Sequence, residues 1–325
     1  MTNEAAPSLQ RDSTFWFFDG NIILQAQNGV IFRVHRGVLA FHSEFFNAMF
    51  DQSLPIPHGF DEDSTIDDCP VIPLEDTAYD VRQLLLVIYG KNSLEDTTFS
   101  VLAALVRVGH KYGMHDVVSK CAPYLRKMVP VSLHEYEEAS EHREDLQFTL
   151  QNAPEALHVF RLIDLGDDGP FILPFMLFLC AQLRDTQIRD GCTREDGTPE
   201  KLSDADVGRI LPLKRELQRR GEQALRIILH FEGPSGYCDR VRNKRYDDCE
   251  WGYLLFFEDM PTSVRNAYKR GDIFGTWAIN RMQDSLYGDI PSPVCRDCLR
   301  PHIEGLEKLR QETWAALPKL AGIME

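Results

Sequence analysis

The chain has 325 residues and a formal net charge of −15, because 50 acidic residues outnumber 35 basic ones. A nucleic-acid backbone is bound mainly by Lys and Arg, so this acidity argues against DNA or RNA as the main partner. Hydrophobic residues make up 43% of the chain and charged residues 26%. These proportions are typical of a globular protein, and the length predicts one or two domains.

The chain shows no pattern for secretion or membrane insertion. Its first ten residues lack the basic start and apolar run of a signal peptide, so we expect an intracellular protein, cytoplasmic or nuclear, with a disordered tail over residues 1–14. The nearly apolar run 170–183 is too short to span a bilayer and is expected to be a buried core helix. Eight cysteines without a signal peptide indicate reduced thiols or a metal site rather than disulfides.

The first structured stretch is predicted to be a small sheet. Residues 15–18 read Phe-Trp-Phe-Phe, which indicates either a strand that covers the core or a dimer face. Residues 22–26 and 30–34 are apolar and β-branched, and Asn28-Gly29 between them is a strong two-residue hairpin signal. Two strands joined by this turn are therefore expected.

Helices are predicted to follow this hairpin. Ser43 is placed to cap a helix whose apolar residues recur at helical spacing, and Thr77 opens a later one. The acidic stretch 61–68 is expected to be a loop, and residues 71–74 a short strand. Further helices are predicted over residues 100–110, 115–128, 133–148, 154–165, 170–183, 204–230 and 293–317, with exposed loops over 185–205 and 232–249.

One string carries a family resemblance. Phe32-x-Val34-His35-Arg36-x-Val38-Leu39, followed by Ser43-x-Phe45-Phe46-x-x-Met49-Phe50, resembles the opening of a BTB/POZ domain. With Asp19-Gly20-Asn21 before it, the chain looks like the large BTB-containing family of mushroom-forming fungi. The resemblance covers residues 15–130 and implies a mixed N-terminal domain of strands and helices. After Pro130 the helical pattern predicts a mostly α-helical C-terminal domain over residues 131–325, so the expected fold class is α+β.

The resemblance implies a protein-interaction protein that is not an enzyme. Relatives homodimerise, so a self-associating scaffold or adaptor is expected. Phe15, Trp16 and Phe17 are expected to form the apolar core of the dimer interface. Arg36 would pair near the two-fold axis with an acid, whose place falls on Asn21 or Asp19.

Two other roles are implied by relatives. Many bind a cullin scaffold and recruit substrates for ubiquitylation, through residues that follow the position of Met49-Phe50. Here Leu54 fills the hydrophobic place of that signature, but Ile56 stands where a glutamate is expected. Other relatives regulate transcription through attached zinc fingers, and the chain has no such finger pattern.

The cysteines form the only constellation with metal-ligand spacing. Cys295-x-x-Cys298 stands at the start of the last predicted helix, and Cys238 and Cys249 lie in the loop region before it. Four thiolates can close a tetrahedral zinc site, which would fasten this loop to the helix. Four ordinary cysteines and a redox-active C-x-x-C are the alternatives. No phosphate-binding glycine loop, His-Glu-x-x-His or Gly-x-Ser-x-Gly pattern is present.

Overall fold

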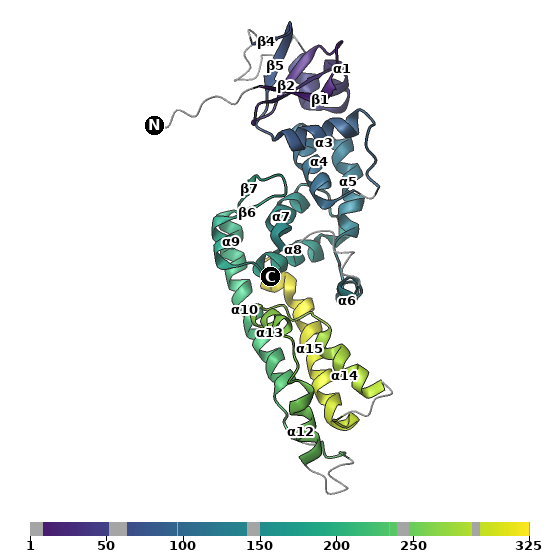
Figure 1. Ribbon diagram of the computed structural model, residues 1–325, viewed down its shortest axis with the longest axis vertical. Coiled ribbons are helices and arrows are strands. Elements are labelled where there is room, and N and C mark those ends of the chain that lie inside the picture. The colour runs from purple at the N-terminus through teal and green to yellow at the C-terminus, as the bar shows by residue number, and fades with distance from the viewer. Residues whose placement is uncertain are drawn as a thin grey trace, which may run out of the picture. The chain divides into compact units, whose positions relative to one another are not determined.

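The computed structural model describes residues 9–51, 64–95, 97–141, 150–233, 235–238, 247–287 and 293–324. The chain divides into two compact units (Figure 1). The first comprises residues 1–127 and 158–165, and the second comprises residues 128–157 and 166–325. The predicted fold class is confirmed, because a mixed sheet-and-helix unit precedes a mostly helical one.

The first unit contains a five-stranded mixed sheet in the order β1-β3-β2-β5-β4. Its strands are β1 (Gln10–Trp16), β2 (Ile22–Gln25), β3 (Val30–Val34), β4 (Thr65–Ile66) and β5 (Cys69–Pro73). Strand β3 lies between β1, to which it is parallel, and β2, to which it is antiparallel. The central strand residues Ile23, Phe32 and Val34 are fully buried. Ile23 pairs with Arg33 and therefore points to the face opposite Phe32 and Val34, so both faces of the central strands are buried.

The predicted tail over residues 1–14 is wrong for residues 10–14, which belong to strand β1. The buried carboxylate of Asp12 fixes this strand. It accepts hydrogen bonds from the N–H groups of Thr14 and Phe15 at 2.8 and 2.9 Å, and it pairs with Arg82 at 2.6 Å. Residues 1–8 lie outside the described part of the chain.

Two turns differ from their predictions. In the β2–β3 hairpin only Gly29 has positive φ, at 82°, and its N–H donates to Ala26 O at 2.9 Å. The loop is thus a three-residue turn that ends in a left-handed glycine, not a two-residue turn. The predicted acidic loop over 61–68 is wrong for residues 65–66, which form strand β4. Residues 67–68 form the turn between β4 and β5, in which Asp67 and Asp68 adopt φ of 50° and 61°.

The helices of the first unit are α1 (Arg36–His42), α2 (Glu44–Phe50), α3 (Ala78–Ile88), α4 (Phe99–Lys111) and α5 (His115–Lys127). Both predicted caps are confirmed. The Ser43 hydroxyl accepts from Phe46 N at 3.0 Å, and the Thr77 hydroxyl accepts from Asp80 N at 3.1 Å. Each bond satisfies a backbone donor that the first turn of a helix leaves unpaired.

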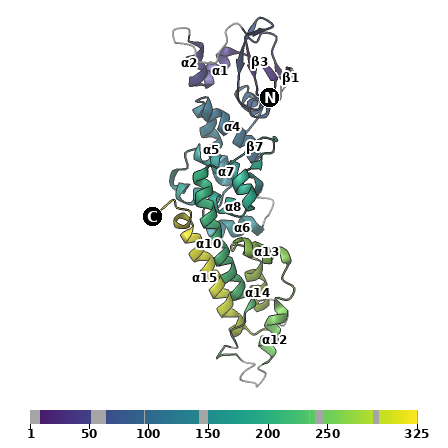
Figure 2. The ribbon, with the colours of Figure 1, turned by 90° about the vertical axis from the view of Figure 1, so that its left-hand side faces the viewer.

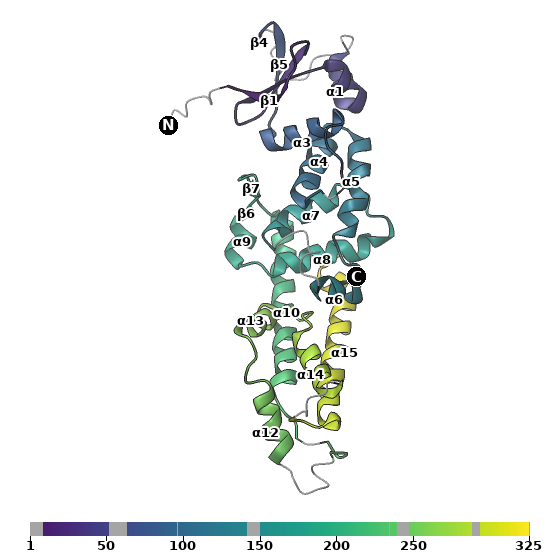
Figure 3. The ribbon, with the colours of Figure 1, turned by 45° about the vertical axis from the view of Figure 1, so that its right-hand side comes forward.

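The second unit is mostly helical. Its elements, with α7 shared between the units, are α6 (Leu133–Glu141), η1 (Leu150–Asn152), α7 (Ala153–Arg161), η2 (Gly166–Asp168), α8 (Gly169–Ala181), α9 (Asp185–Asp190), β6 (Cys192–Thr193), β7 (Pro199–Glu200), α10 (Asp204–Leu229), α12 (Asp247–Phe256), α13 (Thr262–Arg270), α14 (Trp277–Tyr287) and α15 (Arg296–Leu320). The long helices α10 and α15 lie side by side in Figures 1, 2 and 3. None of the described helices is long and apolar enough to cross a bilayer.

The predicted buried helix over 170–183 is confirmed as α8. Its Phe175 and Phe178 are buried and contact an aromatic cluster that includes Phe274 and Trp314. The predicted exposed loop over 185–205 is wrong in part, because it contains helix α9 and the β6–β7 hairpin. The buried carboxylate of Glu200 pairs with Arg194 and holds this hairpin in place.

Candidate functional sites

Helix α1 of the first unit exposes one large apolar side chain. The Phe41 side chain is 84% exposed. A Cβ placed on Gly37, one turn earlier, would meet no heavy atom of the described chain within 4 Å outside its own helix. The open space at Gly37 leaves room for a second protein to approach helix α1 beside the Phe41 ring.

The aromatic run before this helix is divided between core and surface. Phe15 is fully buried, Trp16 and Phe17 are half-buried, and Phe18 is exposed. The Phe17 ring stacks on Tyr89, with ring centroids 5.1 Å apart. Phe15 is thus covered by its own chain and supports the neighbouring aromatic side chains from within.

Of the residues predicted to form a charged pocket, Asn21 contacts the backbone of Arg36, whereas Asp19 contacts His35. Asp19 Oδ1 lies 3.3 Å from His35 Nε2. Asn21 Oδ1 accepts a hydrogen bond from Arg36 N at 2.8 Å, and the Arg36 guanidinium lies over the Phe50 ring at 4.7 Å. Within one chain these residues order the sheet end and helix α1, and their place in a dimer interface stays a prediction.

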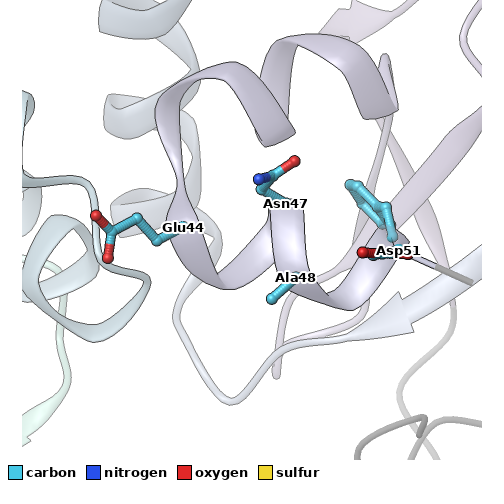
Figure 4. Close-up of a pocket in the computed structure, with 5 residues that line it drawn as sticks. Glu44, Asn47, Ala48 and Asp51 are labelled. Carbon is cyan, nitrogen blue, oxygen red and sulfur yellow. The ribbon is translucent and has the colours of Figure 1, made fainter. Parts of the chain in front are cut away.

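A shallow pocket of about 440 Å³ lies along helix α2. Its lining residues are Glu44, Asn47, Ala48, Phe50 and Asp51. Figure 4 shows Glu44 and Asp51 at opposite ends of the pocket, with Asn47 and Ala48 between them.

The residues predicted to bind a partner lie at and beyond the end of this helix. Met49 and Phe50 are half-buried, and the Phe50 ring stacks on Phe46 at 5.9 Å. The other two predicted residues, Leu54 and Ile56, lie outside the described part of the chain. The cullin signature therefore stays a prediction from sequence.

The four predicted metal ligands are brought together in the second unit. The Sγ atoms of Cys238, Cys249, Cys295 and Cys298 all lie within 4.8 Å of one another. They come from three places in the chain: a turn after α10, the first turn of α12, and the residues that open α15. Cys295 is half-buried and the other three are buried.

Two Sγ–Sγ distances in this cluster are close to those of a tetrahedral thiolate site. Cys238 Sγ lies 3.7 Å from Cys249 Sγ and 3.6 Å from Cys295 Sγ. A tetrahedral zinc ion with Zn–S bonds of about 2.3 Å separates its sulfur ligands by about 3.8 Å. The cluster can therefore accept a zinc-sized ion with little movement of its side chains.

Backbone groups orient the cluster as well. Ser235 N donates to Cys298 Sγ at 3.4 Å, and Cys298 N donates to Cys295 O at 3.1 Å. Burial raises the pKa of both the Cys295 and the Cys298 thiols. Binding of a cation to these sulfurs would therefore displace their protons.

Comparisons with known proteins bear on the first unit. A protein-family model described as the BTB/POZ domain matches residues 16–128. A search of curated proteins gave no match. The family match lies within the predicted range 15–130 and leaves the C-terminal helical unit outside it.

Proposed function

Because residues 16–128 form a BTB/POZ domain, which is a protein-interaction domain, we propose that the chain self-associates through it and serves as a scaffold or adaptor. The exposed Phe41 on helix α1, with open Gly37 one turn away, carries this proposal. Two copies that pack this face against itself would form an isologous two-fold interface. Burial of each phenylalanine would contribute about 2 kcal/mol.

In the proposed dimer, the predicted interface residues would add to the contact made by Phe41. Trp16 and Phe17 would add apolar area, while Asp19, Asn21 and Arg36 would add polar contacts at its rim. Phe15 would act from beneath, because its side chain is fully buried within one chain.

Sedimentation equilibrium of the full chain tests this proposal. Phe41→Ser should shift the mass from dimer toward monomer. Phe171→Ser is the matched control, because Phe171 is also an exposed phenylalanine but lies on helix α8 of the second unit. An unchanged dimer in Phe41→Ser, or a monomeric wild type, would contradict self-association through α1.

Two more specific roles remain as alternatives within the same class. As a cullin adaptor, the chain would use the surface near Met49 and Phe50, where the pocket along α2 lies. Capture of a cullin by the wild type, and its loss in Met49→Lys, would favour this role. As a transcriptional regulator, the chain would act through protein partners, since its net charge of −15 disfavours direct DNA binding.

The helical C-terminal domain is the recognition part of this proposed adaptor, and we infer that its four cysteines hold a structural zinc ion. A closed set of four thiolates is the donor set that structural zinc sites use. The ion would join Cys238 and Cys249 to Cys295 and Cys298 and so tie helix α12 to the start of α15. Its chemistry would be structural, because four protein ligands leave no open coordination position.

A further inference from the structure

Cys295 is the most accessible member of the four-cysteine cluster. It is half-buried, whereas the other three cysteines of the cluster are buried. It stands at the N-cap of helix α15, and its near neighbours in the chain, Pro293 and Arg296, are exposed. A small reagent dissolved in water therefore reaches the Cys295 sulfur before it reaches the other three.

The sulfur of Cys238 lies beside that of Cys295. Their Sγ atoms are 3.6 Å apart, and Cys238 Sγ is also 3.7 Å from Cys249 Sγ. The sulfur of Cys298 accepts a hydrogen bond from Ser235 N at 3.4 Å, which holds it in place. A disulfide needs its two sulfurs about 2 Å apart. Cys238 and Cys295 can therefore bond to each other after a small movement of their side chains.

This pair of sulfurs can be oxidised in two steps by hydrogen peroxide. Thiolates that bind zinc carry no proton, and the thiolate is the nucleophilic form of cysteine. The Cys295 thiolate attacks one peroxide oxygen, the O–O bond breaks, and hydroxide leaves and takes up a proton to give water. The Cys238 thiolate then attacks the sulfenic sulfur of Cys295, so that the S–S bond forms, the S–O bond breaks and a second hydroxide leaves as water. The two sulfurs lose two electrons, which reduce one peroxide to two water molecules.

We propose that the four-cysteine cluster is a peroxide-sensitive switch, in which a disulfide forms between Cys238 and Cys295 and the zinc ion leaves. The two remaining thiolates, Cys249 and Cys298, are too few for a structural zinc site, which uses four protein ligands. This inference rests on the zinc site of the proposed function and assigns a form of regulation to it. It does not depend on self-association through α1.

The structural effect of the switch is expected at the start of α12. Cys249 in its first turn would lose its link to α15 when the ion leaves. Farther along α12, the Tyr253 hydroxyl lies 2.9 Å from Ile228 O and 3.0 Å from His302 Nδ1, and neither contact involves the cluster. Oxidation should therefore raise amide hydrogen exchange in the first turn of α12 and leave the middle of the helix protected.

Native mass spectrometry of the full-length zinc-bound protein, before and after a slight excess of hydrogen peroxide, tests the switch. Each chain should lose one zinc ion, and the thiols titrated in the unfolded chain should fall from eight to six. Peptide mapping should identify a Cys238–Cys295 disulfide, and dithiothreitol with added zinc should restore the starting mass. Cys192 is an internal control, because it is also half-buried but lies outside the cluster. Burial and the Glu200 carboxylate raise the pKa of Cys192, so it should stay an unreacted thiol.

Two variants complete the test. Cys192→Ser should release zinc in peroxide as the wild type does, whereas Cys295→Ser should form no disulfide under the same treatment. The mapping of the wild type stands even if Cys295→Ser folds poorly. Zinc that stays bound in peroxide, or a disulfide between other cysteines, would overturn the switch and leave the zinc site intact. A metal-free protein before treatment would instead contradict the zinc site itself, and the switch with it.

Discussion

Cys238 Sγ and Cys249 Sγ lie 3.7 Å apart although the two residues are eleven positions apart in the chain. Their spacing in the sequence is longer than that of a common zinc-binding pair. Cys249 nevertheless lies beside Cys238, because the first turn of helix α12 packs close to the turn that holds Cys238. The tertiary fold therefore brings together two thiols whose spacing in the sequence only suggests a metal site.

Removal of two of the four sulfurs should release the metal and loosen α15. Native mass spectrometry should find one zinc ion per wild-type chain and none in Cys295→Ser with Cys298→Ser. The variant should also lose about 2 kcal/mol or more of unfolding free energy, because metal binding adds to folding stability. Cys192→Ser is the control, since Cys192 lies outside the cluster. Metal-free wild type with unaltered melting in the double variant would contradict a structural metal.

Protonation of Asp12 in acid should remove the interactions that hold strand β1 and so lower the free energy of unfolding. Burial of this carboxyl opposes its ionisation, but hydrogen bonds from Phe15 N–H and Arg82 outweigh burial and lower its pKa below 3.8. The ionised group therefore stabilises the fold above its ordinary pKa, and this contribution is lost as the pH falls through the lower folded value. Asp12→Asn should cost about 1–3 kcal/mol at pH 7, and its unfolding free energy should change less than that of wild type on acidification.

Asp67→Asn provides the comparison for Asp12. Asp67 also pairs with an arginine, Arg11, at 2.9 Å, but both side chains are largely exposed. An exposed pair contributes about 0–1 kcal/mol, so this variant should melt close to wild type. Equal losses in the two variants, measured by chemical denaturation at pH 7, would show that burial of Asp12 is not the cause.

The crossing of α10 and α13 should depend on Gly221. A Cβ at this position would lie 1.8 Å from Tyr268 O, a backbone atom that cannot move aside as a flexible side chain can. Gly221→Ala should therefore force the helices apart and destabilise the second unit by about 1–3 kcal/mol. Gly208→Ala on the same helix should be neutral or stabilising, because outside that helix a Cβ there meets no described atom within 4 Å. Thermal melting of the two variants in the same buffer would reveal the difference, and similar melting would contradict the close approach.

The hydroxyl of Tyr253 should contribute measurably to the attachment of α12. Tyr253→Phe removes its bonds to Ile228 O and His302 Nδ1, and it should cost about 1–3 kcal/mol because these buried groups lose a partner. Amide hydrogen exchange should rise in α12 of this variant. Tyr237→Phe, at a side chain that is 73% exposed, should leave both exchange and stability unchanged. Unaltered protection of α12 in Tyr253→Phe would disprove this anchoring role.

The sequence alone determined the N-terminal domain and most helices, because these depend on local signals. Ser43 and Thr77 begin helices wherever their hydroxyls can accept a nearby backbone N–H, and the apolar pattern of β2 and β3 requires a buried face. The sequence does not predict strand β1 over residues 10–14, because this polar stretch gains its place through pairing with β3 and through the contact of Asp12 with Arg82, seventy positions away.

The tertiary structure determines that the four cysteines lie together and which side chains of helix α12 are exposed. The spacing of the four cysteines in the sequence indicates a possible metal site but does not distinguish it from a redox role or from four ordinary cysteines. Their convergence needed the packing of α10, α12 and α15, whose contacts connect residues far apart in the chain. In the same way, Trp251 and Leu254 are apolar residues of the kind expected in a core. They are exposed because Gly252 and Tyr253, on the other side of the same helix, are buried. Side chains face outward when the opposite face of their helix packs better, and that choice depends on contacts between distant parts of the chain.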